Sequence, residues 1–228
     1  SKKSTYIRDA FKPIIPENTK IIDLKLDNEI LTINFSKEFL TVNETNEELM
    51  REALIYSLTE LKEIKKIKIL VENIPFTKLP NSNKKLPEYL DKTYGINKIY
   101  NLNSLKETSK TTIYYLSKIN DYYYYVPVTK VSNEKLERVE IIIKELKSTP
   151  IYHTNLISYL KASANMTNYE LLENAISLSF NNYLIANMKE EQILEEVKYS
   201  IALSLRDTYG INEVIFNIPD SENSKISI

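Results

Sequence analysis

The sequence of 228 residues contains no cysteine, no tryptophan, one histidine and only two glycines. Without cysteine the chain forms no disulfides and offers no thiolate ligands to a metal. Two glycines are too few for a loop that cradles a phosphate group. No apolar stretch approaches the ~20 residues of a membrane-spanning helix, and no run of Lys or Arg forms the basic stripe of a nucleic-acid-binding protein. Disulfide scaffolds, thiolate metal sites, phosphate-loop enzymes and nucleic-acid partners are therefore disfavoured.

What is present is typical of a globular protein. Apolar residues make up 43% of the chain, and 30 basic residues balance 31 acidic ones. A chain of this length accommodates two domains of about 100–120 residues each. The composition thus allows one or two sizeable cores and leaves the number of domains to the sequence pattern.

Both glycines lie in the same pentapeptide, "TYGIN", at Thr93–Asn97 and again at Thr208–Asn212. Sliding the chain against itself by that spacing (208 − 93 = 115) aligns little else. We therefore interpret "TYGIN" as a turn that occurs twice. Gly210 is expected to supply the positive φ that ends a helix, and Gly95 to do the same for the first domain.

Two other offsets indicate an internal duplication. At 145, Lys20–Phe35 falls on Asn165–Phe180 with matching alternation of apolar residues, and at 144 Glu47–Pro75 falls without a gap on Glu191–Pro219. Both of the latter segments end on "NIP". Apolar matches alone are common between amphipathic helices, but a shared order of strand, strand, helix, strand and closing tripeptide favours two copies of one domain.

The offset of 144 also indicates where the first copy begins within the repeat. At 144, Lys3–Ile7 falls on Lys147–Ile151, so the first copy would begin partway and lack a counterpart of Thr112–Leu146. Our hypothesis is that a preceding segment of a longer protein holds the rest of the first copy and a membrane anchor or secretion signal. The predicted domains are residues 1–102 (first copy, truncated at its N-terminus) and 112–228 (second copy), joined by a linker at 103–111.

Periodicity predicts the elements of each copy. In the first copy we expect a hairpin of Ile21–Leu26 and Ile30–Phe35, a helix opened by a Thr45/Glu48 capping box, a strand at Ile67–Val71 and a loop-rich tail from Pro75 to Ser109. In the second we expect a hairpin of Ile113–Tyr115 and Tyr122–Val128, a helix from Ser132 to Leu146, a hairpin of Thr167–Leu172 and Ala175–Phe180, a helix from about Lys189 to Asp207 and a strand at Val214–Ile218. Apart from the extra hairpin, each copy reads helix–strand–strand–helix–strand. The predicted fold class is α+β, a small mixed sheet with helices on one face in two tandem domains.

Three segments resemble a known family, the GerM domains of sporulation and germination proteins. Val126–Lys130 matches the family's L-V-P-V-T-R-like strand with Lys for Arg, Pro16–Thr19 matches its P-x-G-T turn with Asn18 for Gly, and Ser57–Glu60 matches its T-L-T-E-like helix. Asn is the usual non-glycine residue in left-handed turns. The chain departs from the pattern where "NIP" replaces the glycine after the last strand, and where the second copy lacks a clear P-x-G-T turn.

The resemblance implies tandem domains of the ring-building-motif type. It implies a non-enzymatic, extracytoplasmic scaffold of a spore-forming Firmicute, held at a membrane by an N-terminal lipoprotein or signal segment. It also implies protein partners in the complex that links mother cell and forespore, with no cofactor. A cell-wall module that binds peptidoglycan and localises a partner hydrolase is the alternative.

The residues offer little for catalysis, which needs a nucleophile with its base, paired carboxylates or a metal cluster. The single histidine, His153, is interpreted as a surface or packed structural residue. No loop carries the spaced acidic ligands of a calcium site, and the carboxylates of segments such as "EEQILEE" are read as a solvated helix face. We predict no enzymatic activity, no metal and no cofactor, although nothing in the sequence excludes a carboxylate pair for glycan hydrolysis.

One expected hairpin is rich in tyrosine, with Tyr114 and Tyr115 on one strand and Tyr122, Tyr123, Tyr124 and Tyr125 on the other. Alternation along a strand sends Tyr122 and Tyr124 to one face and the other two to the opposite face. Cross-strand aromatic pairing explains the cluster structurally. The functional interpretation is that these tyrosines, together with Lys130, form a docking surface for a protein or for a glycan strand, because tyrosine is enriched at interfaces.

Overall fold

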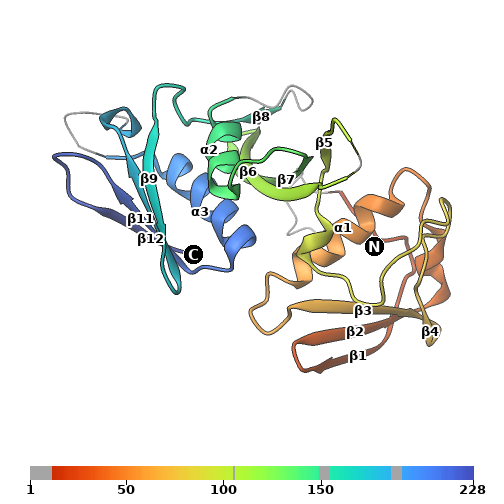
Figure 1. The fold of residues 1–228 in the computed structure, drawn as a ribbon. Helices are drawn as coiled ribbons and strands as arrows, with labels where there is room; N and C mark the ends of the chain where they lie inside the picture. Colours follow the sequence, from red (N-terminus) through yellow and green to blue (C-terminus); the bar gives the residue numbers. More distant parts are fainter. Residues whose placement is uncertain (1–11, 105, 149–154, 186–191) are drawn as a thin grey trace. The chain divides into compact units, whose positions relative to one another are not determined.

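The computed structural model describes residues 12–104, 106–148, 155–185 and 192–228. Chain contacts divide it into two compact units, Ser1–Ile96 and Asn97–Ile228. The first unit has one mixed sheet and the second has two, and helical segments pack against the sheets of each unit (Figure 1). The predicted α+β fold class is therefore confirmed. Within the described ranges no helix is long and apolar enough to cross a membrane.

The first unit contains one sheet in the order β1-β2-β3-β4, formed by Ile21–Asp27, Ile30–Phe35, Lys66–Val71 and Ile74–Pro75. β1 and β2 form the predicted hairpin, whose turn uses positive φ at Asn28 and Glu29. α1 (Glu47–Leu58) connects β2 to β3, which lie parallel. It packs its apolar side on the same core as these two strands, through Met50 and Ile55. The short 3-10 helices η1 (Lys37–Thr41) and η2 (Lys92–Tyr94) flank this core.

The predicted capping box at α1 is wrong. Asn46 precedes the helix, and the Thr45 hydroxyl instead hydrogen-bonds to Asn43 Oδ1 at 2.9 Å. Glu48 has other partners, because Lys84 Nζ lies 2.7 Å from its carboxylate and Arg51 also donates to it. A carboxylate engaged in two ion pairs has no need of the backbone N–H that a capping box would supply.

The second unit contains two sheets. One has the order β12-β11-β10-β9, from Ser224–Ser227, Glu213–Asn217, Ala175–Phe180 and Met166–Leu171; the other has the order β5-β7-β6-β8, from Ile99–Asn101, Tyr122–Ser132, Ser109–Ile119 and Leu156–Ile157. α2 (Arg138–Leu146) and α3 (Glu195–Tyr209) contribute to one core with residues of both sheets. β5, β8 and β12 are too short to give a periodic signal, and the sequence did not predict them.

Two boundaries in this unit differ from the prediction. The first helix begins at Arg138 and not at Ser132, because Ser132 stays in β7, paired with Ser109. Its capping box is formed by Glu137 and Glu140. The second helix begins at Glu195, and the expected start near Lys189 lies outside the described residues.

The division between the units falls before the predicted boundary at residue 102. β5, at the end of the predicted first domain, hydrogen-bonds to β7 and so belongs to the second unit. β6 begins at Ser109, within the segment 103–111 that was expected to be a linker.

The structure confirms the offset of 145 for the hairpins and corrects the offset of 144 for the helix and the strand that follows it. Ile30 pairs with Lys66, as Ala175 pairs with Glu213. The hairpins therefore match at 145 (175 − 30), but the last strands match at 147 (213 − 66). At the same offset of 147, the buried Met50 falls on the buried Val197 (197 − 50) and the buried Leu54 on the buried Ile201 (201 − 54). The two "NIP" tripeptides are thus not equivalent: Asn73 lies in the turn after β3, whereas Asn217 ends β11.

Candidate interaction surface

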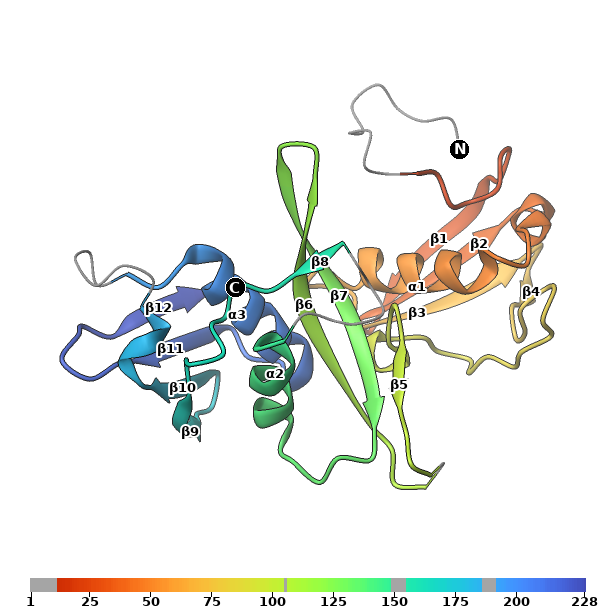
Figure 2. The same ribbon diagram turned by 90° about the horizontal axis from the view of Figure 1, so that it is seen from above.

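The tyrosine hairpin consists of β6 and β7, a long two-stranded ribbon that ends in a tight turn (Figure 2). Its register places Tyr125 opposite Leu116 and Tyr123 opposite Lys118. Residues directly opposite each other in antiparallel strands share a face. Tyr123, Tyr125 and Tyr114 therefore leave by one face, and Tyr122 and Tyr124 by the other.

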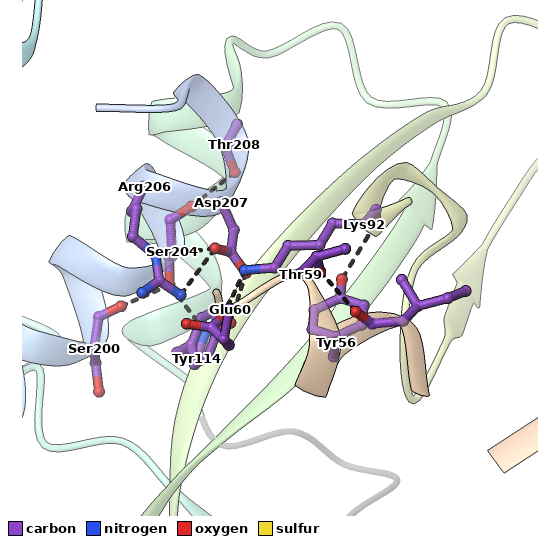
Figure 3. A network of polar contacts seen from close by, with 11 residues as sticks. Tyr56, Thr59, Glu60, Lys92, Tyr114, Ser200, Ser204, Arg206, Asp207 and Thr208 are labelled. Atoms are coloured by element: carbon purple, nitrogen blue, oxygen red, sulfur yellow. Dashed lines mark hydrogen bonds and ion pairs between the residues drawn. The ribbon is translucent and has the colours of Figure 1, made fainter. Parts of the chain in front are cut away.

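The two tyrosines of β6 are buried and attach the hairpin to its own unit. Tyr115 belongs to the core, and burial raises the pKa of its hydroxyl far above the ordinary value. Tyr114 donates from its hydroxyl to Asp207 Oδ2 at 2.5 Å, and its backbone N–H donates to Ser204 Oγ at 2.9 Å (Figure 3). Both acceptors lie on α3. These contacts fix β6 along α3.

The tyrosines nearest the turn are the accessible ones. The exposed fractions of Tyr122 and Tyr123 are 51% and 43%, whereas Tyr124 and Tyr125 are half-buried. The Tyr123 ring meets the Tyr159 ring edge-on with centroids 6.3 Å apart, and their hydroxyl oxygens lie 3.1 Å apart. That hydrogen bond is the main cause of the raised pKa of Tyr159.

Tyr125 packs against α3, with its ring tilted by 48° to that of Tyr199. Its ring centroid lies 5.9 Å from that of Tyr199. Burial, followed by the nearby carboxylate of Glu196, raises the pKa of Tyr125 to about 12. We call Tyr123, Tyr125, Tyr159 and Tyr199 the tyrosine surface. Sequence reasoning missed Tyr159 and Tyr199, because they are isolated tyrosines in other elements and only the tertiary fold brings them to the hairpin.

Lys130 lies at the opposite end of β7 from the turn and is buried. Its ammonium donates to Glu145 Oε1 at 2.7 Å and also to Glu134. Burial lowers the pKa of this ammonium, but the two hydrogen bonds to carboxylates outweigh burial, and the pKa is raised overall. Lys130 thus holds β7 to α2, and it reaches a partner only if this network opens.

The six predicted tyrosines and Lys130 therefore separate into two groups. Tyr114, Tyr115 and Lys130 support the hairpin from within, and Tyr122–Tyr125 carry the accessible area. That this area binds a partner stays a prediction, as does the expectation that the protein has no enzymatic activity. His153 lies outside the described residues.

The first unit has a comparable anchor at the end of α1. Lys92 Nζ donates to Glu60 Oε1 at 2.5 Å, and its carbonyl accepts the Tyr56 hydroxyl at 3.3 Å (Figure 3). These bonds hold η2 against the C-terminal end of the helix.

Two copies of hairpin, helix and parallel strand define the class of protein: a tandem α+β domain protein. Comparison with known proteins refines this. Residues 2–77 match the Germane family, described as sporulation and spore germination. Over 217 residues the chain is 26% identical to the spore germination protein GerM of Bacillus subtilis (strain 168). This alignment covers 92% of the present chain and 59% of GerM.

A solved structure shows the same fold. The tandem GerMN domains of the sporulation protein GerM from Bacillus subtilis superpose with a TM-score of 0.85 at 22% identity, covering 94% of this chain and 76% of that one. The resemblance to tandem GerM domains is therefore confirmed. The chain spans only 59% of the length of the curated relative that it matches.

Proposed function

We propose that this protein is a non-enzymatic scaffold that acts in sporulation or germination by binding other proteins. Homology to GerM supports the role in sporulation or germination. The proposal includes a location outside the cytoplasm, attachment to a membrane through a segment outside this chain, and protein partners in the complex between mother cell and forespore. The resemblance to GerM domains supports these three points.

The observation that carries the binding role is the tyrosine surface. Two of its rings, Tyr123 and Tyr159, are 43% and 37% exposed although they contact each other. The hairpin beneath them is fixed by Tyr114 and Tyr115. Tyrosine binds partners well because it buries a large area with few rotatable bonds and retains a hydroxyl for hydrogen bonding. A rigid support lowers the entropic cost of binding further.

The first test is genetic. Deletion of the gene in its own host should reduce the count of heat-resistant or germinating spores while vegetative growth stays normal. Normal spore counts and germination, in a strain with no second copy of the gene, would contradict the proposed role.

The second test asks whether the tyrosine surface carries that role. The deletion strain is complemented with Tyr123→Ser/Tyr159→Ser and, as a matched control, with Tyr183→Ser, which replaces a tyrosine 60% exposed elsewhere in the same unit. We expect the double variant to accumulate and fold normally but to restore spores poorly, and the control to restore them fully. Full restoration by the double variant would remove the surface from the proposal.

The alternative function, peptidoglycan binding, is favoured by the same ring pair, since exposed tyrosine rings are also suited to stacking against sugars. Co-sedimentation with purified sacculi distinguishes the two. Retention of the wild-type chain on sacculi, lost in Tyr123→Ser/Tyr159→Ser, would favour the cell-wall module over the protein scaffold.

A further inference from the structure

The first strand of the first unit, β1, lies at the edge of its sheet (Figure 1). Each of its residues is exposed. Its sequence is "IIDLKLD", without proline or glycine. Four of its side chains are large and apolar: Ile21, Ile22, Leu24 and Leu26 are 61%, 48%, 57% and 48% exposed. Within the described ranges β2 is its one paired neighbour. An exposed edge strand of this kind is a template for pairing with another strand.

The two faces of β1 differ in chemistry. Leu24 is paired with Ile33 and Leu26 with Leu31, and both β2 residues are buried in the core under α1. Leu24 and Leu26 thus extend the apolar face of the sheet past the area that the core covers. Asp23, Lys25 and Asp27 alternate with them and lie on the opposite face.

We propose that β1 pairs antiparallel with β1 of a second copy of this chain, with Leu24 of one copy opposite Leu24 of the other. A two-fold axis at this position is the symmetry of a closed dimer. On the apolar face Ile22 would lie opposite Leu26, but it falls at the irregularity in the β1–β2 register between Ile21 and Asp23, so the pairing rests on the regular segment Asp23–Asp27. On the other face the axis places Asp23 opposite Lys25, and it does so twice. The charges of Asp23 and Lys25 are therefore complementary to those of a second copy, whereas Asp27 would lie opposite Ile21, which is outside the regular part of the strand.

The neighbouring registers lack this match. Centring the pair on Asp23 brings the two Asp23 carboxylates together, and centring it on Lys25 brings together the two ammonium groups and also sets Asp23 against Asp27. Like charges directly opposite each other destabilise a strand pair. A shift of one residue would place charged side chains opposite apolar ones on both faces. The sequence of β1 therefore selects one antiparallel register with itself.

The equivalent strand of the second unit does not have these properties. At the hairpin offset of 145, β1 corresponds to β9, which is also an edge strand. Two of its residues, Met166 and Tyr169, pack against the core of their unit. Centring β9 on Tyr169 would set Asn168 against Glu170, which is not a pair of opposite charges. β9 thus serves as an internal control. The dimer does not rest on the proposed role in sporulation.

Charge exchange tests the register directly. Sedimentation equilibrium of the 228-residue chain, over roughly micromolar to millimolar concentration, should show a reversible dimer. In a dimer of Asp23→Lys, the new lysine of each copy would face Lys25 of the other copy. In a dimer of Lys25→Asp, the new aspartate of each copy would face Asp23 of the other copy. Each variant alone should therefore dimerise at least tenfold more weakly than the wild type. An equimolar mixture of these two variants, and the double variant Asp23→Lys/Lys25→Asp, should dimerise as the wild type does.

The control is Glu170→Lys on β9, which should leave the dimer unchanged. A wild-type chain that stays monomeric up to millimolar concentration would overturn the proposal. So would single variants that dimerise like the wild type, or a mixture that dimerises no better than its components. All substituted side chains are exposed, and unchanged far-UV circular dichroism and melting temperature would show that each variant folds.

A single thiol provides an independent measurement. Because the chain has no cysteine, Leu24→Cys carries one thiol only. Opposite residues of antiparallel strands have Cα atoms about 4.5–5.5 Å apart, within the range of a disulfide. Mild oxidation should convert most of this variant to a covalent dimer, at least tenfold faster than Leu171→Cys on β9. Equal rates for the two variants would contradict the pairing.

Discussion

The two units build the same hairpin, helix and parallel strand, but they cover the sheet to different extents. In the second unit, α2 and α3 share one core with β10 and β11, and Met166 and Tyr169 of the edge strand pack against it. In the described part of the first unit, α1 covers β2 and β3, and the apolar residues of β1 remain exposed. The comparison teaches that one arrangement of elements can leave an edge strand either supported by its own core or open to a second chain.

The largest effect is expected where the two helices meet their cores. Leu54 and Ile201 occupy equivalent buried positions, 9% and 0% exposed. Truncation of each to alanine should lower the free energy of unfolding of its own unit by about 2–5 kcal/mol, with the larger loss for Ile201→Ala because that site is fully enclosed.

Hydrogen exchange resolved by residue, combined with urea unfolding, measures this. Loss of protection should concentrate in the unit that carries the substitution. Equal loss in both units would show that they unfold together and would break the comparison between them.

The equivalence of Leu54 and Ile201 also shows what the sequence could predict. Gapless matching at offset 144 misplaces the second helix and strand by three residues (147 − 144). Three residues are nearly one helical turn, so apolar positions still coincide along α1 and α3. In a strand the same shift exchanges the faces. It aligned Leu70, half-buried on the outer face of β3, with Val214, which is fully buried.

The local sequence pattern was therefore sufficient to predict the hairpins, the strands β3 and β11 that follow the helices, and the turn at Gly210. Each of these elements has a short pattern that does not depend on distant residues. The local pattern failed for Tyr159 and Tyr199, which no spacing along the chain connects to the hairpin. It failed also at Lys130, whose burial depends on carboxylates of Glu134 and Glu145 that fold back onto β7. Contacts of this kind depend on the tertiary structure.

A second prediction compares cations at equivalent positions of the two helices. Arg51 corresponds to Lys198 (198 − 51 = 147). The Arg51 side chain is fully buried, and its guanidinium carbon lies 3.7 Å from the Tyr94 ring centroid. Its Nε and one terminal nitrogen have no hydrogen-bond partner among the described residues. Lys198 pairs with Glu195, whose side chain is 65% exposed.

Arg51→Ala should therefore cost about 2 kcal/mol, because it removes buried packing on Tyr94 as well as a charge. Lys198→Ala should cost less, about 1 kcal/mol, because its ion pair with the exposed Glu195 contributes little and the loss comes from the packing of its largely buried stem. Chemical denaturation of both variants checks the difference. An Arg51→Ala variant as stable as Lys198→Ala would mean that the two unsatisfied nitrogens cost as much as the packing contributes.

The smallest effect concerns the two "TYGIN" turns, which end different elements. Gly95 follows η2 with φ 86° and ψ 162°, a region open almost only to glycine. Gly210 ends α3 in the left-handed conformation with φ 72° and ψ 23°, which asparagine tolerates. An added Cβ at Gly210 would meet no atom within 4 Å, so the cost of substitution there is conformational.

Gly95→Asn is accordingly expected to cost about 1–2 kcal/mol, and Gly210→Asn only a few tenths of a kcal/mol, with Gly210→Ala near 1 kcal/mol. Melting temperatures of the three variants rank these costs. Equal losses for the two asparagine variants would show that identical pentapeptides impose identical constraints, whereas the expected order would show that the backbone conformation around each glycine, and not its sequence, sets the constraint.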